Sequence, residues 1–147
     1  MPIPRIRSKI AHALVEDLGL GSAVVFAGFV NKTADLYAAA DVVVNPARFP
    51  EPFGRVALEA LVAGRPFIGS RVGAIPDVIR DGVDGLLVEP GDPGELADAI
   101  IRLGQDGELR KRLVKQGQSH VRETFDETRA TAAFADFVNE TVAATRS

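Results

Sequence analysis

The sequence of 147 residues contains no cysteine, which excludes disulfides and thiolate metal sites. Its two histidines, His12 and His120, stand far apart and show no metal-ligand spacing. No apolar run approaches the length of a membrane span. The first residues also lack the apolar stretch of a secretory signal peptide. These absences predict a cytoplasmic protein.

Charge and composition exclude several classes of partner. The net charge of −3 at pH 7 gives no reason to expect a nucleic acid or an anionic membrane as the main partner. Hydrophobic residues make up 46% and charged residues 25% of the chain, as in ordinary globular proteins. The length suits one domain with a substantial core.

Short apolar runs alternate with helical patterns along the chain. We predict helices over 5–18, 32–40, 75–80, 92–104 and 106–124, and strands over 23–27, 41–46, 66–69 and 85–88. Alternating strands and helices predict an α/β fold with a Rossmann-like parallel sheet flanked by helices. Ligands of such sheets bind beyond the carboxyl ends of the strands. The segments 28–30, 46–54 and 70–74 are expected at that edge.

The stretch EPFGRVALEALVAG, residues 51–64, organises the rest of the chain. Two prolines keep its start out of a helix. Gly54 is expected just before a helix, and Gly64 is expected as its left-handed stop. Because residues 56–63 are almost wholly apolar, we expect this helix to be buried on most sides.

Glu59 is a carboxylate in this apolar helix, and Glu51 lies eight positions earlier. One hypothesis is a ligand site, in which the first-turn amides of Arg55 and Val56 meet a diphosphate. Gly54 would let that anion approach, and the two carboxylates would accept hydrogen bonds from sugar hydroxyls. The other hypothesis is a buried helix, with Glu59 paired to a neighbouring arginine and Glu51 solvated. These residues alone leave both hypotheses open.

Four segments resemble retaining GT-B glycosyltransferases of the glycosyl transferase group 1 type, in the order of that family. They are 24–30 (VVFAGFV), 36–46 (LYAAADVVVNP), 51–66 (EPFGRVALEALVAGRP) and 73–88 (GAIPDVIRDGVDGLLV). The resemblance runs from about residue 10 to about residue 125. It implies the incomplete C-terminal half of a GT-B fold, which binds a nucleotide sugar as substrate without a metal or another cofactor.

The resemblance also implies a role for each matching residue. Glu51 would be the catalytic residue near the reacting face of the donor sugar, with Phe53 beside the same sugar. Glu59 would bind the ribose hydroxyls, and the amides of residues 54–56 would bind the diphosphate. The turn with Gly28 and Val30 would lie against the base, whose identity among uracil, guanine and adenine stays open.

In one respect the sequence departs from the family. The acceptor domain and the first strand–helix unit, with the Arg and Lys that clamp the diphosphate, have no counterpart in these residues. The resemblance therefore implies a donor-binding domain over 1–125 that lacks the first strand–helix unit. It also implies a C-terminal helix over 126–147. Arg48, Arg55 and Arg71 are the nearest candidates to replace the clamp, although Arg55 is expected to point into solvent.

Two functions fit these observations. The first is the donor-binding part of a retaining glycosyltransferase, a hexosyltransferase-like enzyme that is inactive without an acceptor domain. The second is a non-catalytic nucleotide-binding or interaction domain derived from that fold. The expected partners are a nucleotide sugar and either a second copy or a separate acceptor-domain chain, and any peripheral membrane association would come through the acceptor half. A dinucleotide-binding oxidoreductase is disfavoured, because Gly19 and Gly21 precede a predicted strand instead of following one.

Overall fold

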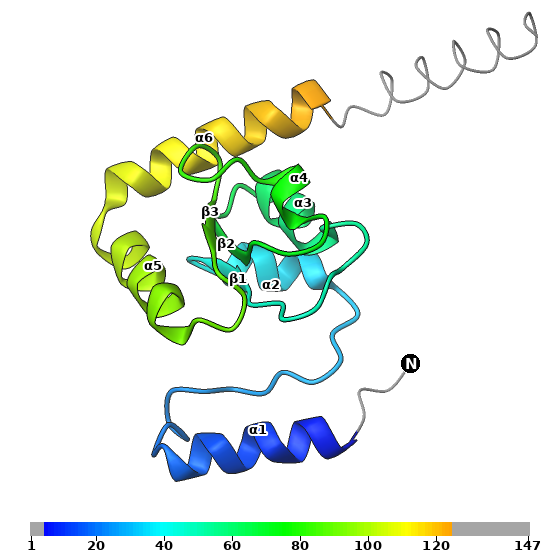
Figure 1. The fold of residues 1–147 in the computed structure, drawn as a ribbon, viewed down its shortest axis with the longest axis vertical. Coiled ribbons are helices and arrows are strands. Elements are labelled where there is room, and N and C mark those ends of the chain that lie inside the picture. The colour runs from blue at the N-terminus through cyan, green and yellow to red at the C-terminus, as the bar shows by residue number, and fades with distance from the viewer. Residues whose placement is uncertain (1–4, 125–147) are drawn as a thin grey trace, which may run out of the picture. The chain divides into compact units, whose positions relative to one another are not determined.

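The computed structural model describes residues 5–124. It divides into two compact units, Met1–Thr33 and Ala34–Ser147. The helices are α1 (Arg5–Asp17), α2 (Thr33–Ala39), α3 (Arg55–Val62), α4 (Ile75–Val78), α5 (Pro93–Gln105) and α6 (Gly107–Thr124); the strands are β1 (Val43–Asn45), β2 (Phe67–Ser70) and β3 (Leu86–Val88) (Figure 1). Among these residues no helix is long and apolar enough to cross a membrane. The predicted helix over 126–147 lies outside the described residues.

The first unit contains the predicted N-terminal helix. Helix α1 (Arg5–Asp17) confirms the amphipathic pattern over 5–18. Gly19 follows it with a φ of 66°, a left-handed conformation that glycine adopts without steric cost at a helix end. Beyond the turn the chain returns toward α1, and the ring of Phe26 stacks on His12 with a centroid distance of 3.8 Å.

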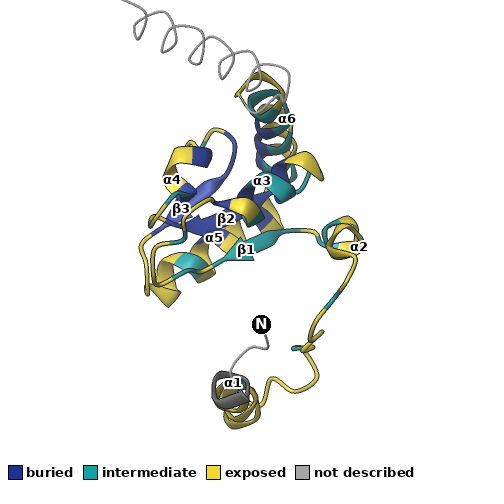
Figure 2. Ribbon diagram, turned by 90° about the vertical axis from the view of Figure 1, so that its right-hand side faces the viewer, coloured by how far each residue is buried: buried dark blue, intermediate teal, exposed yellow. Residues whose placement is uncertain are grey.

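The strand predicted over 23–27 is wrong. The structure gives residues 24–30 no helix, strand or turn, and most of this segment is exposed (Figure 2). Val25 and Phe29 are 88% and 91% exposed. An apolar, β-branched composition shows that a segment suits a sheet but does not supply its neighbour. A strand forms only where another strand satisfies its N–H and C=O groups. The sheet of the described residues consists of β1, β2 and β3.

The three strands of the second unit form a parallel sheet in the order β1-β2-β3. Val44 stands opposite Ile68, and Gly69 stands opposite Leu87. The central strand β2 and the strand β3 are buried throughout, whereas β1 is half-buried, as Figure 2 shows. The predictions of strands near 41–46, 66–69 and 85–88 and of an α/β fold are confirmed.

Helices cover both faces of this sheet. On one face Phe67 and Leu87 pack with the apolar residues of α3 and α4. On the other face Ile68, Leu86 and Val88 pack with α5 and the first half of α6. Successive strand residues alternate between the two clusters because side chains of a strand point to opposite faces. The unit is therefore a three-layer α/β/α structure.

Helix α3 is buried on one side only, which corrects the expectation drawn from its composition. Ala57, Ala60 and Leu61 are buried, but Val62 is 65% exposed. On the buried side α3 packs closely on α6, where a Cβ at Gly117 would stand 2.6 Å from the Leu61 side chain. An almost wholly apolar composition does not show which side of a helix lacks a neighbour.

Helix α5 begins as predicted and ends later. The Asp92 side chain accepts hydrogen bonds from the amides of Gly94 and Glu95, a standard N-terminal cap. The helix continues through Gly104, where we expected its end, to Gln105. Glycine costs about 1 kcal/mol in a helix interior, and the complete burial of the neighbouring Leu103 offsets that cost.

The loop after β2 supports the loop before α3. The amide of Ala74 donates to the carbonyl of Glu51 at 3.0 Å. Gly73 has a φ of 60°, and a Cβ there would lie 2.5 Å from the Glu51 nitrogen and 2.6 Å from its carbonyl oxygen. At Gly54 a Cβ would lie 3.0 Å from Val78 and 3.3 Å from the Ala74 oxygen. Two glycines thus let these two loops pack together.

A buried carboxylate joins the segment after α4 to the turn before β3. The Asp84 side chain is fully buried and accepts from the amide and the guanidinium Nε of Arg80, each at 2.6 Å. Arg80 is half exposed, so water reaches one partner of the ion pair and not the other. The pair fixes the turn that leads into β3.

Replacing Gly73 by alanine is expected to destabilise the second unit by about 1–3 kcal/mol, because the new Cβ strains the backbone and displaces the Glu51 loop. Gly82→Ala is the matched control, since Gly82 has a φ of 72° but no atom within 4 Å of its Cβ position. Urea unfolding would measure both variants. Equal losses would contradict the close packing of the two loops.

Asp84→Asn is expected to lower the free energy of unfolding by about 2 kcal/mol. The asparagine can still accept from the Arg80 amide, but its NH₂ group would face the guanidinium donor. Asp98→Asn, on the exposed side of α5, is expected to change the stability by less than about 0.5 kcal/mol. An Asp84→Asn loss as small as the Asp98→Asn loss would show that the buried pair does not stabilise the turn.

Candidate functional site

The loops that follow β1 and β2 meet at the carboxyl edge of the sheet, as the sequence predicts for segments 46–54 and 70–74. The hydrogen bond from Ala74 to Glu51 joins them. The third predicted segment, with Gly28 and Val30, belongs to the first unit. Its contact with a ligand base stays a prediction.

Glu51 is half-buried, not solvated as one hypothesis had it. Its Oε2 accepts from the Nδ2 of Asn45, the last residue of β1, at 3.1 Å. Its Oε1 is buried and has no hydrogen-bond partner among the described residues. Leaving a buried polar atom without a partner costs about 1–3 kcal/mol, more for a charged group. A ligand hydroxyl placed against this oxygen would satisfy it.

The N-terminus of α3 is open to an anion. Gly54 occupies the N-cap position with φ 56° and ψ 31°, and no side chain caps the helix. The first bond of the ladder runs from the amide of Leu58 to the Gly54 carbonyl at 3.1 Å, so the preceding amides have no intrahelical acceptor. By contrast, the N-terminus of α5 is closed by Asp92. The predicted positions of Gly54, Arg55 and Val56 at a helix start are confirmed.

Glu59 lies one turn into α3 and is half-buried. Its Oε1 accepts from the Nε of Arg55 at 2.6 Å, an i,i+4 pair. The hydrogen bond from Arg55, followed by one from Tyr37, lowers the pKa of Glu59 below its ordinary value. The pairing with a neighbouring arginine that one hypothesis predicted is therefore present. The Arg55 side chain is 83% exposed, in agreement with the expectation that it points into solvent.

Tyr37 is a site residue that sequence reasoning missed. It comes from α2 and packs against the cluster that contains Ala57 and Ala60 of α3. Burial, and then the hydrogen bond to Glu59, raise the pKa of Tyr37 to about 12. Its hydroxyl stays protonated near neutral pH and donates to the carboxylate. No short-range pattern links Tyr37 to Glu59, because the two are distant in sequence.

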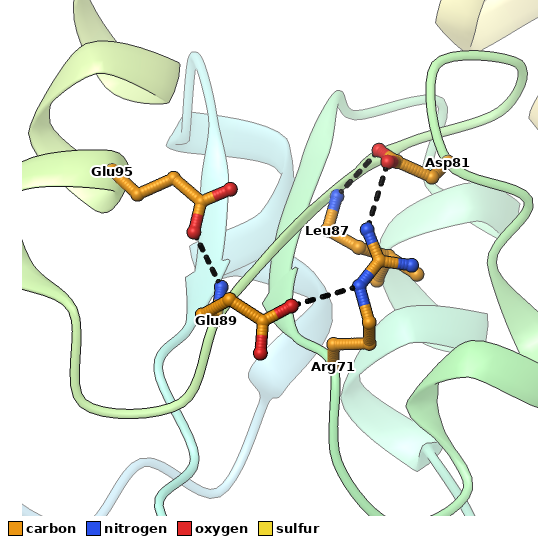
Figure 3. A network of polar contacts seen from close by, with 5 residues as sticks. All are labelled: Arg71, Asp81, Leu87, Glu89 and Glu95. Carbon is orange, nitrogen blue, oxygen red and sulfur yellow. Dashed lines mark hydrogen bonds and ion pairs between the residues drawn. The ribbon is translucent and has the colours of Figure 1, made fainter.

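The arginines considered as diphosphate clamps have different surroundings. Arg71 is held by Asp81 Oδ2 at 3.0 Å and Glu89 Oε1 at 3.2 Å (Figure 3). Asp81 also accepts from the Leu87 amide at 2.9 Å, so the network joins the end of β2 to β3. These two ion pairs hold the Arg71 side chain at the sheet. Arg48 lines a cavity together with Pro46, Ser70 and Val88.

The arrangement suits a ligand that carries both an anion and hydroxyl groups. An uncapped helix N-terminus favours the anion, and two carboxylates on either side of it favour hydroxyl donors. Phe53 lies between them and is 77% exposed, so its ring is accessible. No group of three His, Asp or Glu side chains in the described part of the chain could hold a metal ion.

Residues 4–106 match the family model described as Glycosyl transferases group 1. The D-inositol 3-phosphate glycosyltransferase of Acidothermus cellulolyticus is 41% identical over 111 residues, which are 74% of this chain and 24% of that protein. The curated relatives that this chain matches are much longer, and the alignments span between 22% and 29% of their length.

Solved structures share the fold. Anabaena HepE in complex with UDP superposes with a TM-score of 0.87 and 31% identity, covering 90% of this chain and 36% of that one. The C-terminal domain of a glycosyl transferase group 1 protein, LpcC from Francisella tularensis, has a TM-score of 0.75 and 31% identity over 85% of this chain and 66% of that one. The Rossmann-like sheet is thus that of the C-terminal half of a GT-B fold, and the chain belongs to the glycosyl transferases group 1 family.

Proposed function

We propose that this chain binds a nucleoside-diphosphate sugar and forms the donor side of a retaining glycosyltransferase. The observation that carries the proposal is the buried Oε1 of Glu51, which has no hydrogen-bond partner among the described residues, in the loop that leads to the uncapped N-terminus of α3. A ligand that carries a sugar hydroxyl and a diphosphate would satisfy both the Glu51 oxygen and the first-turn amides of α3. The UDP complex of the related HepE supports a ligand of this class.

Each part of the donor has a proposed contact. The diphosphate binds the amides of residues 54–56, and the ribose hydroxyls bind Glu59, which Tyr37 holds in place. Glu51 and Phe53 contact the transferred sugar, while a contact of Gly28 and Val30 with the base stays a prediction. Asn45 keeps one Glu51 oxygen engaged at 3.1 Å, so that the other points to the sugar.

In the proposed reaction the bond between the anomeric carbon and a diphosphate oxygen breaks. The oxygen of an acceptor hydroxyl bonds to that carbon on the same face, and its proton passes to the departing diphosphate, which keeps the electron pair of the broken bond. Charge develops on the leaving diphosphate, and the fixed amides and dipole of α3 stabilise it. We propose that no metal and no cofactor other than the nucleotide sugar takes part.

The acceptor is proposed to bind a separate surface, supplied by an acceptor-domain chain or by a second copy of this chain. The half-buried strand β1 pairs on one side with β2, which leaves an edge able to accept another strand. The exposed Val25 and Phe29 of the first unit are further apolar surface. We place the complete enzyme in the cytoplasm, without nucleic acid as a partner.

A second candidate function is a non-catalytic nucleotide-binding domain. It is favoured by the charges near the site: Arg71 is bound by two carboxylates, and Arg55 is paired with Glu59. Each charge-assisted phosphate contact that is missing weakens binding by about 1.5–3 kcal/mol. Nucleotide binding without transfer, even with an acceptor-domain chain added, would favour this alternative.

Calorimetric titration with UDP, GDP and ADP tests the donor site. Glu59→Gln is expected to weaken binding of the preferred nucleotide by about tenfold, because a neutral amide accepts hydroxyl hydrogen bonds less strongly than a carboxylate. The matching 2′,3′-dideoxynucleotide, which lacks these hydroxyls, is the control ligand and should bind both proteins alike. No binding of any nucleotide by the folded chain would refute the proposed function.

The pH dependence of this binding follows from the lowered pKa of Glu59. The carboxylate is the form that accepts from the ribose, so its contribution is complete at neutral pH. It should persist through the ordinary glutamate range near pH 4.3 and disappear only as the pH falls below it. An early loss, at the ordinary glutamate pKa, would show that neither Tyr37 nor the ribose hydroxyls donate to this carboxylate in the bound state.

Glu51→Gln is expected to leave the affinity for the nucleoside diphosphate unchanged. The affinity for the nucleotide sugar, by contrast, should fall by about tenfold, since a charge-assisted hydrogen bond to the sugar is weakened. The glutamine oxygen can still accept from Asn45, which preserves the loop. Glu108→Gln, a substitution on the surface of α6, is the control. If the nucleotide sugar bound Glu51→Gln and native protein equally, Glu51 would not contact the sugar.

A further inference from the structure

A groove lies between α3 and α6, away from the candidate site. The two helices touch where a Cβ at Gly117 would stand 2.6 Å from the Leu61 side chain (Figure 2). Next to this contact the groove opens to a volume of about 210 Å³, and the described residues that line it are Val62, Gln118, Val121 and Arg122. None of them belongs to the donor residues assigned above, so the groove needs its own explanation.

The groove is apolar in its middle and polar at its rim. Val62 is 65% exposed, and Val121 is half-buried and packs against the core cluster. Gln118 lies close to the turn after α3, since a Cβ at Gly64 would stand 2.8 Å from its Nε2. The Nε of Arg122 donates to the Gln118 carbonyl at 3.1 Å, which keeps the charged side chain beside α6. Such a surface fits the apolar side of another helix.

The chain itself supplies a segment of this kind. Helix α6 ends at Thr124, three positions after Val121, and the chain continues to Ser147. The sequence predicts a helix over 126–147, and Asp126 is a suitable N-cap residue. Apolar residues recur along one side of this helix at Ala130, Ala133, Phe134, Phe137, Val138 and Val142. With a rise of 1.5 Å per residue it would be about 33 Å long, enough to run back along the whole of α6.

We propose that residues 126–147 fold back as a helix antiparallel to α6 and place their apolar side in the groove. Two residues at the turn suffice for such a helical hairpin. Because both helices rise equally per residue, Ala133 and Phe134 come opposite Gln118, beside Val62. Asp126 and Glu127 bring negative charge to the turn, close to Arg122.

The covalent link favours this segment over any other occupant. A tether of a few residues gives it an effective concentration in the millimolar range, whereas a second copy or an acceptor-domain chain must be recruited from solution. The groove lies at the C-terminal end of α3, and the diphosphate is proposed at the N-terminal end. The inference therefore goes beyond the proposed function and does not require it.

Disulfide formation in the full chain tests the proposal, because the native chain has no cysteine. Val62→Cys combined with Ala133→Cys places one thiol in the groove and one on the apolar side of the segment. With diamide as oxidant, an intrachain disulfide should form at least tenfold faster than in Val62→Cys combined with Ala132→Cys. This second pair is the matched control, because neighbouring helical residues point about 100° apart and Ala132 would face away from the groove. Non-reducing electrophoresis and peptide mass spectrometry would measure both rates.

Three results of this experiment would overturn the proposal. Equal rates for the two pairs would show that the segment meets the groove in no fixed orientation. No disulfide in either pair would show that it does not reach the groove. A disulfide between two chains, which runs as a dimer, would make the segment of a second copy the occupant instead.

Limited proteolysis gives a second test that needs no cysteine. Val62→Asp puts a charge into the apolar part of the groove, which should release the segment. Chymotrypsin should then cleave after Phe134 and Phe137 about fivefold faster than in the native chain, because an undocked segment is open more often. Val25→Asp, at a position that is 88% exposed in the first unit, is the matched control and should leave the rate unchanged. Equal cleavage of the Val62→Asp and Val25→Asp proteins would contradict the docking.

Discussion

The packing of Gly73 against the backbone of Glu51 is the contact on which the site depends. It brings the loop after β2 within van der Waals reach of the loop before α3, and the Ala74 amide adds a hydrogen bond of 3.0 Å. The central strand β2 is fully buried, so this loop starts from the most rigid part of the sheet. Glu51, although in a loop, is therefore positioned by the sheet.

The network around Arg71 continues this support toward β3. The Arg71 amide donates to the Val88 carbonyl at 2.8 Å, and the side chain joins Asp81 to Glu89. Exposed ion pairs contribute little individually, about 0–1 kcal/mol. Here their effect is geometric, since they fix the direction in which the chain leaves β2 and β3. The loops after β1 and β2 meet through the bond from Ala74 to Glu51, and a cavity lined by Pro46, Ser70 and Val88 lies at the ends of the three strands.

The sequence predicted those parts of the fold that local chemistry determines. Gly54 and Gly64 marked the ends of α3 because their left-handed conformations disfavour other residues. Asp92 predicted the start of α5, because its side chain caps amides that lie only two and three positions later. The segment 23–27 was wrongly predicted because a strand depends on a neighbour that no local pattern specifies. Helix α3 was expected to be buried on most sides for a similar reason: composition shows what a helix can bury, not what covers it.

The site shows the same division between local and long-range information. Glu51, Gly54 and Glu59 were predictable because one loop and one helix hold them all. Tyr37 and Asn45, which orient the two carboxylates, come from other elements, and only the folded chain brings them near. The pair between Arg55 and Glu59 could be predicted from its i,i+4 spacing, and the sequence offered it as one of two hypotheses.

That pair does not oppose the role proposed for α3. The Arg55 side chain is 83% exposed, so water screens its attraction to Glu59 and the pair contributes little. A diphosphate at the helix N-terminus brings two or more negative charges to the end of the helix where Arg55 lies, and charge-assisted phosphate contacts are the stronger kind. Arg55 is therefore expected to turn from Glu59 to the phosphate when the donor binds. Tyr37 still holds Glu59 at that moment, and the oxygen that Arg55 leaves becomes an acceptor for ribose.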